Sequence, residues 1–64
     1  MKCKLKEIRK RDSITQSDIA NKLNIKQNTV SKWENNNAVP NLRLAYELAE
    51  YLEVEVTDIW EKKN

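Results

Sequence analysis

The sequence has no glycine and no histidine, and only one cysteine and one proline, among its 64 residues. With no histidine and with Cys3 as the single thiol, one chain cannot form a zinc site from cysteine and histidine side chains or an internal disulfide. These absences also exclude serine–histidine and cysteine–histidine catalysis. No apolar run is long enough to span a membrane or resembles a signal peptide. We therefore expect a cytoplasmic, non-enzymatic protein with no metal, cofactor or membrane contact.

The absence of glycine also limits how helices can end. A tight turn between helices needs a residue that tolerates the left-handed backbone conformation, and after glycine this is best done by asparagine. Asn24 stands between two helical patterns, and the run Asn35–Asn37 follows the second of them. We expect Asn24 to form a tight turn and the asparagine run to end a helix.

The length of the chain predicts one domain, residues 1–64. A domain of this size buries only about 60% of the surface that its unfolded chain exposes, so we expect modest stability. Oligomerisation is a common remedy for low stability.

Charge is unevenly distributed along the chain. Residues 1–33 contain nine basic and three acidic residues, a net charge of +6, whereas residues 34–64 contain three basic and seven acidic residues, a net charge of −4. Solvent-exposed helix faces often carry such charges. The asymmetry also fits a protein whose first half faces a polyanion.

Two short helices are predicted before Asn24. Residues 2–11 place two apolar residues three apart among lysines and arginines, which is typical of a short amphipathic helix. Thr15 is a good N-cap for a second helix over residues 16–23, and Asp18 can complete a capping box with it.

Two further helices are predicted after Asn24. Residues 26–35 would face the core with Val30 and Trp33. A fourth helix, residues 42–52, would begin after Asn41 as its N-cap. Its apolar residues follow the 3.6-residue period of a helix, and we expect them to form the centre of the core: Leu42, Ala45, Leu48, Ala49 and Leu52.

The end of the chain has a weaker pattern. The valines and glutamates of residues 53–56 alternate as in a strand, but a single strand would have no partner, so we expect a connection. Thr57 would then cap a last turn over residues 58–61, and residues 62–64 would form a frayed polar tail.

The four aromatic residues are assigned by their helical positions. Trp33 is expected in the core. Trp60 could close the core or lie in a dimer interface, and the sequence does not decide between them. Tyr46 and Tyr51 flank the apolar stripe of residues 42–52, so we expect them to be partly buried.

Residues 16–35 therefore combine two short helices and a tight turn, the arrangement of a helix-turn-helix. The major groove of DNA, about 12 Å wide, admits one α-helix; glutamine and asparagine can form two bonds with adenine, and lysine can reach guanine. Gln27 and Asn28 lie in the first turn of the second helix, with Lys32 four residues after Asn28 on the same face. This pattern favours reading of bases in duplex DNA.

Phosphate contacts would set the position of such a helix on DNA. They are favoured at helix N-termini, where free N–H groups point toward an anion. Thr15 and Gln16 lie at one such start, and the Asn35–Asn37 turn could supply a second clamp.

Residues 5–60 resemble the phage repressor and Cro-type helix-turn-helix family, also called the xenobiotic-response-element family. The resemblance is carried by three successive segments, LKEIRKRDSITQSDIANKL, IKQNTVSKWENN and VPNLRLAYELAEYLEVEVTDIW. It implies an all-α fold: a compact, four- to five-helix, lambda-repressor-like DNA-binding domain.

The resemblance also implies roles for individual residues. Gln16 would bond a phosphate and brace a side chain of the recognition helix, and Arg9 would pair with Glu34 as a structural contact. The implied DNA-binding residues are Thr15, Gln16, Lys26, Gln27, Asn28, Thr29, Lys32 and Asn35.

This chain departs from the family pattern at several positions. Lys26 replaces a serine or threonine cap, and Asn36 and Glu53 replace glycines. The loop after Glu34 lacks the lysine or arginine that the family often places there, so we expect weaker phosphate binding from it.

The expected function is sequence-specific binding of double-stranded DNA by a transcriptional regulator, most simply a repressor that is nucleoid-associated when bound. Two copies would bind a near-palindromic operator with half-sites about 34 Å apart. An alternative is an antitoxin-like interaction module whose acidic half binds a partner protein. RNA binding is disfavoured, because the major groove of A-form RNA excludes a helix.

Overall fold

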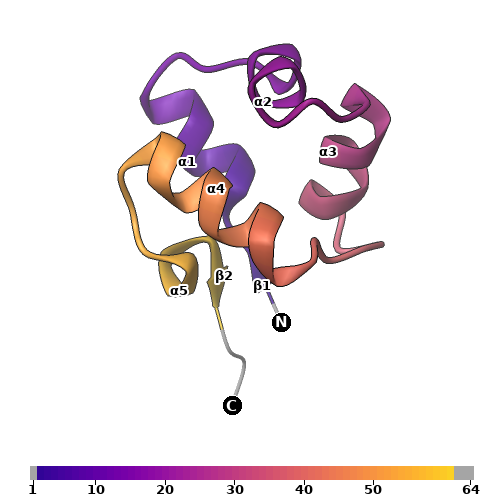
Figure 1. Ribbon diagram of the computed structural model, residues 1–64. Helices are drawn as coiled ribbons and strands as arrows, with labels where there is room; N and C mark the ends of the chain where they lie inside the picture. The colour runs from indigo at the N-terminus through magenta and orange to yellow at the C-terminus, as the bar shows by residue number, and fades with distance from the viewer. Residues whose placement is uncertain (1, 62–64) are drawn as a thin grey trace.

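The computed structural model describes residues 2–61, and the polar tail expected at residues 62–64 lies outside them. The described residues form five helices and two very short strands (Figure 1). In chain order the elements are β1 (Lys2–Cys3), α1 (Leu5–Arg11), α2 (Gln16–Leu23), α3 (Gln27–Glu34), α4 (Leu42–Leu52), α5 (Val56–Ile59) and β2 (Trp60–Glu61). The predicted all-α class, with four helices and a short fifth, is confirmed.

The start of α2 has the predicted capping box. The Thr15 side chain accepts from the backbone N–H of Asp18 at 3.0 Å, and the Asp18 carboxylate accepts from the backbone N–H of Thr15 at 2.9 Å. These bonds satisfy two N–H groups that the first helical turn leaves without partners. Ile19, just after the box, belongs to the core cluster, and Ile14, just before it, is partly buried and packs against that cluster.

The turn between α2 and α3 is made by Asn24, which is left-handed with φ 58° and ψ 48°. Asn36, two residues after the end of α3, adopts the same left-handed conformation, with φ 61°. Both roles were predicted from the tolerance of asparagine for this region. Ser13 and Glu53 are also left-handed, with φ 58° and 57°, although neither is a residue that favours it.

The core is a single cluster to which all five helices contribute. Trp33 is 2% exposed and Trp60 is 7% exposed, and their rings meet edge to face with centroids 6.4 Å apart. Trp60 therefore closes the core, which decides between its two possible positions. Its indole nitrogen Nε1 is buried without a hydrogen-bond partner among the described residues.

The beginning of the chain differs from the prediction. The helix begins at Leu5 and not at residue 2, because β1 pairs with β2 in an antiparallel ladder that joins Lys2 to Glu61 and Cys3 to Trp60. The Lys4 ammonium lies 2.9 Å from the Glu61 carboxylate. The hydrogen bond from Lys4 holds the pKa of Glu61 below its ordinary value.

The predicted cap of the last helix is also wrong. α5 begins at Val56, with Glu55 as its N-cap, and not after Thr57. The backbone N–H of Glu55 donates to the Asp58 carboxylate over 2.9 Å. The N-cap of this helix therefore lies two residues earlier than predicted. Residues 53–55 do form a connection, as expected.

The first half of α4 is less buried than its sequence pattern predicts. Asn41 caps this helix, as expected, by accepting the N–H of Leu44 at 2.9 Å. However, Leu42 is 71% exposed and Tyr46 is 61% exposed, since no described element covers this side of the helix. The predictions that Leu42 lies in the core and that Tyr46 is partly buried are therefore wrong, whereas Tyr51 is partly buried.

The capping box makes stability depend on pH. The hydrogen bond from the Thr15 backbone N–H holds the pKa of Asp18 below its ordinary value of 3.8. Because this pKa is lowered in the folded state, the stabilisation is complete above the ordinary value and is lost as pH falls through the folded pKa. We predict that Asp18→Asn lowers the melting temperature at neutral pH and that the difference from the wild type shrinks below about pH 4. Thermal unfolding followed by circular dichroism at several pH values tests this, and a difference that does not change with pH would contradict it.

Candidate nucleic-acid interface

The starts of α2 and α3 lie together, and two glutamines join them. Gln27, the first residue of α3, donates from Nε2 to Oε1 of Gln16, the first residue of α2, over 3.3 Å. The Ser17 hydroxyl also lies against the Gln27 amide, with its Oγ 3.0 Å from Oε1. The side chain at the start of α3 is thus held by two residues of α2 and remains exposed.

Behind the glutamines lies an ion pair that connects three helices. Arg9 of α1 donates to the Glu34 carboxylate at the end of α3 through Nε at 2.6 Å and Nη2 at 3.2 Å. Gln16 of α2 donates from Nε2 to the same carboxylate at 3.0 Å. The side chains of Arg9 and Glu34 are only 13% and 5% exposed. The expected Arg9–Glu34 contact is therefore present, and its bonds raise the pKa of Arg9.

This network sets the orientation of the Gln27 amide. An ionised carboxylate can only accept hydrogen bonds, so Gln16 must turn its amide nitrogen toward Glu34. The oxygen of Gln16 is then left to accept from Gln27, which must present its own nitrogen. The Gln27 oxygen consequently faces Ser17. Glu34 thus acts through Gln16 to determine that the Gln27 amide nitrogen faces Gln16 and its oxygen faces Ser17.

The other residues predicted for the site lie around this pair. Asn28 and Lys32 are exposed on α3, and Thr29 is partly buried. Thr15 is occupied in the capping box. Lys26 is the N-cap of α3 and makes no side-chain cap bond, as the departure from the family pattern predicted. Asn35 is exposed just after α3, with its side-chain nitrogen 3.4 Å from the Ser31 hydroxyl.

The asparagine turn after α3 is tied to the start of the chain. Oδ1 of Asn36 accepts the backbone N–H of Cys3 over 3.1 Å, so this amide stabilises the fold.

Burial raises the pKa of the Cys3 thiol, which keeps it protonated and poorly nucleophilic at neutral pH.

Ser17 was not among the predicted site residues. Its contact with Gln27 joins residues ten apart, and neither spacing nor periodicity indicates such a contact. The only signal in the sequence was its place beside Gln16 in the first turn of α2.

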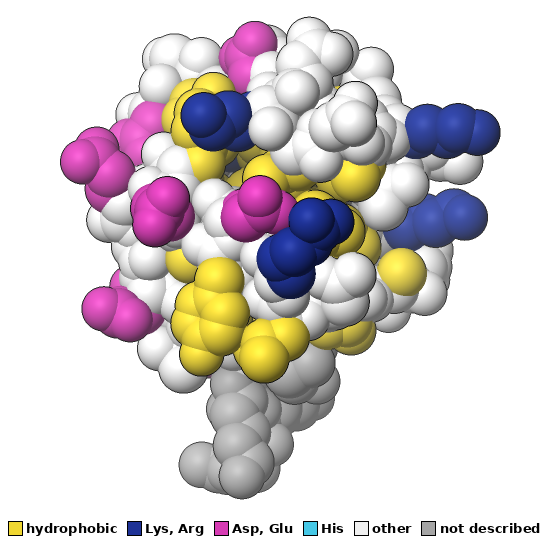
Figure 2. Space-filling view, in the orientation of Figure 1, with side chains coloured by type: hydrophobic (Ala, Val, Ile, Leu, Met, Phe, Trp, Pro, Cys, Tyr) yellow, Lys and Arg dark blue, Asp and Glu magenta, His cyan; other side chains and the backbone are white. Residues whose placement is uncertain are grey.

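Charge is separated on the face of the molecule that carries α4. Figure 2 shows most acidic side chains over the left part of this face, on the side of α5 and the end of α4; Lys and Arg side chains project on the right, on the side of α3, and others lie among the acidic ones at the upper left and the centre. The sign asymmetry of the sequence is thus only partly an asymmetry in space on this face.

The described residues contain neither a candidate metal site nor a helix that could span a membrane. Among residues 2–61, no group of three His, Cys, Asp or Glu side chains could hold a metal ion. In the same part of the chain, no helix combines the length and the apolar character needed to cross a membrane.

Comparison with known proteins agrees with this geometry. Residues 5–59 match the helix-turn-helix family, a span that includes all five helices. The chain belongs to the helix-turn-helix family. It is 37% identical over 60 residues to an uncharacterised HTH-type transcriptional regulator of Methanocaldococcus jannaschii, covering 94% of this chain and 91% of the relative.

A second relative is also similar along its full length. It is an uncharacterised HTH-type transcriptional regulator of Archaeoglobus fulgidus, 28% identical over 71 residues, with 98% of this chain and 100% of the relative covered. The resemblance to the Cro-type helix-turn-helix family and the lambda-repressor-like fold are confirmed by the family match, and both relatives are named as transcriptional regulators.

Within this helix-turn-helix domain, Arg9 neutralises a carboxylate that would otherwise be buried with a single amide partner. We predict that Arg9→Met lowers the free energy of unfolding by about 3 kcal/mol, because removing one member of a buried pair leaves the other charge uncompensated. Arg11→Met is the matched control, since Arg11 pairs with Asp12 on the surface and its removal should leave stability nearly unchanged. Urea unfolding measures both variants, and equal effects would contradict a special role for Arg9.

Proposed function

We propose that this helix-turn-helix protein is a transcriptional regulator, acting as a repressor, that binds double-stranded DNA in a sequence-specific manner. It would read the major groove with α3 and its flanking residues, 26–35, and bind a near-palindromic operator as a homodimer. It would work in the cytoplasm, associated with the nucleoid when bound. The family match and the names of both relatives support a DNA-binding regulator.

The observation that carries this proposal is the fixed amide of Gln27. An amide has two N–H donors and an oxygen with two acceptor sites, and Gln16 and Ser17 engage one of each. One donor and one acceptor remain on an exposed side chain at the start of α3. These are the two groups that bond N7 and N6 of adenine in the major groove. The orientation set by Glu34 would favour one placement of that adenine.

The remaining residues of the site fit the surroundings of such a contact. Asn28 and Lys32, one turn apart on the exposed side of α3, would read neighbouring base edges. The contacts with the DNA backbone would come from the first turn of α2 and from residues at both ends of α3: Thr15, Gln16, Lys26, Thr29 and Asn35.

Selection of bound duplexes from a random pool, followed by shift assays, tests the reading of bases. We predict that Gln27→Ala and Lys32→Ala each weaken binding to the selected site by about 1–3 kcal/mol and relax preference at one base position. Asn21→Ala and Lys10→Ala are matched controls, because both residues are exposed but lie outside the site. Equal effects of site and control variants would overturn the assignment of α3 as the reading element.

Binding should also depend steeply on salt. Each phosphate neutralised by the protein releases counterions, which gives a slope of about −0.9 in a plot of log affinity against log salt concentration. We predict that Lys26→Ala, which removes a cation at the start of α3, reduces the magnitude of the slope by about one unit without changing base preference. A wild-type affinity that does not change with salt would contradict DNA binding altogether.

A further inference from the structure

Ser17, the second residue of α2, contacts the side chain to which the proposed function assigns the reading of adenine. Its Oγ lies 3.0 Å from Oε1 of Gln27, whereas Nε2 of Gln27 lies 3.3 Å from Oε1 of Gln16. Hydrogen bonds usually span about 2.7–3.2 Å for an N–H donor and about 2.5–3.0 Å for a hydroxyl donor. The contact with Ser17 is therefore the better formed of the two that hold the Gln27 amide.

The direction of this hydrogen bond is fixed by its acceptor. The amide oxygen of Gln27 can only accept, so the Ser17 hydroxyl must donate its single hydrogen to it. A phosphate oxygen also only accepts, so the same hydroxyl cannot hold Gln27 and donate to the DNA backbone at once. The Ser17 side chain is thus placed to act on DNA through Gln27 and not by a phosphate contact of its own.

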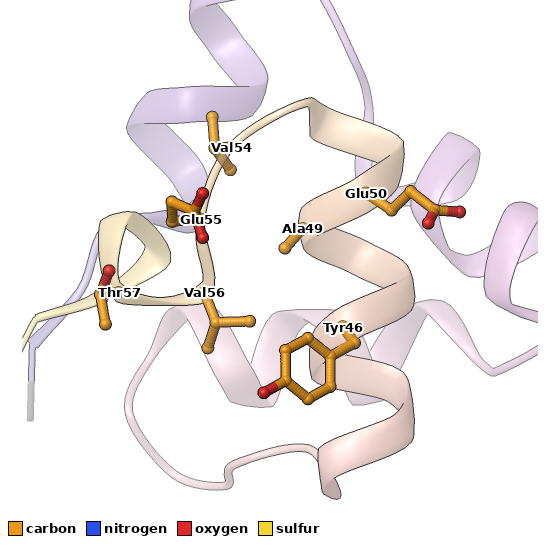
Figure 3. Close-up of a pocket in the computed structure, with 7 residues that line it drawn as sticks. All are labelled: Tyr46, Ala49, Glu50, Val54, Glu55, Val56 and Thr57. Atoms are coloured by element: carbon orange, nitrogen blue, oxygen red, sulfur yellow. The ribbon is translucent and has the colours of Figure 1, made fainter.

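A shallow hollow of the surface lies on another part of the fold. Tyr46 and Ala49 line it from α4, and Val54 and Val56 line it from the chain that leads into α5. Figure 3 shows the Tyr46 ring beside this hollow, with Val54 and Val56 on its opposite side. None of its lining residues belongs to α2 or α3, so it does not enclose Gln27. The restraint on the exposed Gln27 amide comes instead from its hydrogen bonds.

An amide held in this way suits adenine and not guanine. In the major groove adenine presents the acceptor N7 beside the donor N6, whereas guanine presents two acceptors, N7 and O6. An unrestrained glutamine could meet guanine by turning both N–H groups toward these acceptors. Here Gln16 engages one N–H of Gln27, and Ser17 keeps the oxygen from turning away. Guanine would then place O6 against the Gln27 oxygen, which is an unfavourable contact between two acceptors.

We propose that Ser17 is a positioning residue that makes Gln27 discriminate adenine from guanine. The Ser17 hydroxyl holds the amide before DNA binds, so less side-chain freedom is lost on binding. A rotation of the amide that would admit guanine must first break the bond from Ser17. This inference rests on the proposed reading of DNA by Gln27, and it adds the residue that sets the choice between the two purines.

Shift assays test the proposal at the base pair where Gln27→Ala relaxes preference. The selected operator is compared with a duplex in which this A·T pair is changed to G·C. Ser17→Ala should reduce the ratio of the two affinities by about two- to tenfold, the effect of losing one hydrogen bond. Ser17→Thr retains a hydroxyl and should keep most of the ratio. Asn21→Ala is the matched control, because this exposed residue lies one turn later on α2. Circular dichroism verifies that each variant is folded.

A double-mutant cycle distinguishes action through Gln27 from a direct contact with DNA. Residues that act as a unit have effects that do not add. In the Gln27→Ala background, Ser17→Ala should therefore leave the affinities for both duplexes unchanged. A further loss of affinity in that background would show that Ser17 contacts DNA itself and would overturn the proposal.

Nuclear magnetic resonance of the protein without DNA gives an independent readout. Ser17→Ala should lower the order parameter of the Gln27 side-chain amide and leave the backbone order parameters of α2 and α3 unchanged. An equally ordered amide in the variant would contradict the positioning role, as would guanine at this position of the selected operator. A wild type with no preference among duplexes would overturn the proposed function and this inference together. A wild type that prefers its operator, with an unchanged ratio in Ser17→Ala, would overturn this inference alone.

Discussion

The arrangement of this domain depends on one carboxylate. Glu34 accepts hydrogen bonds from Arg9 of α1 and from Gln16 of α2, so a residue at the end of α3 connects the first three helices. A buried charge is costly unless it is paired and hydrogen-bonded, and here both conditions are met. The same carboxylate orients the exposed Gln27 amide through Gln16. The fold and the candidate reading surface therefore share one electrostatic constraint, and a change at Glu34 would affect both.

Much of the fold was predictable because its signals are local. Thr15 and Asp18 stand at the spacing of a capping box, and Asn24 is a residue that tolerates the left-handed turn between α2 and α3. The Arg9–Glu34 pair was expected from the resemblance and is present. The positions of Gln27 and its neighbours on an exposed helix face were also predicted, but their contact with DNA stays a prediction.

The remaining features depend on contacts between distant residues, which periodicity does not show. The two strands are two residues long each, and their pairing joins the two ends of the described chain. Leu42 follows the helical period of the core residues, but a period does not reveal whether another element covers the first turn. Ser17 was missed for the same reason, because its partner lies on another helix.

The lack of glycine has a further consequence for this fold. Left-handed backbone costs a residue with a Cβ atom about 1–2 kcal/mol, and Ser13 and Glu53 adopt this conformation without the tolerance that asparagine has. Neither residue belongs to the network around Glu34. Part of the cost is offset because a chain without glycine has fewer conformations to lose on folding. Ser13 and Glu53 are therefore two positions at which a single change to glycine would relieve backbone strain and could compensate a destabilising change elsewhere in the domain.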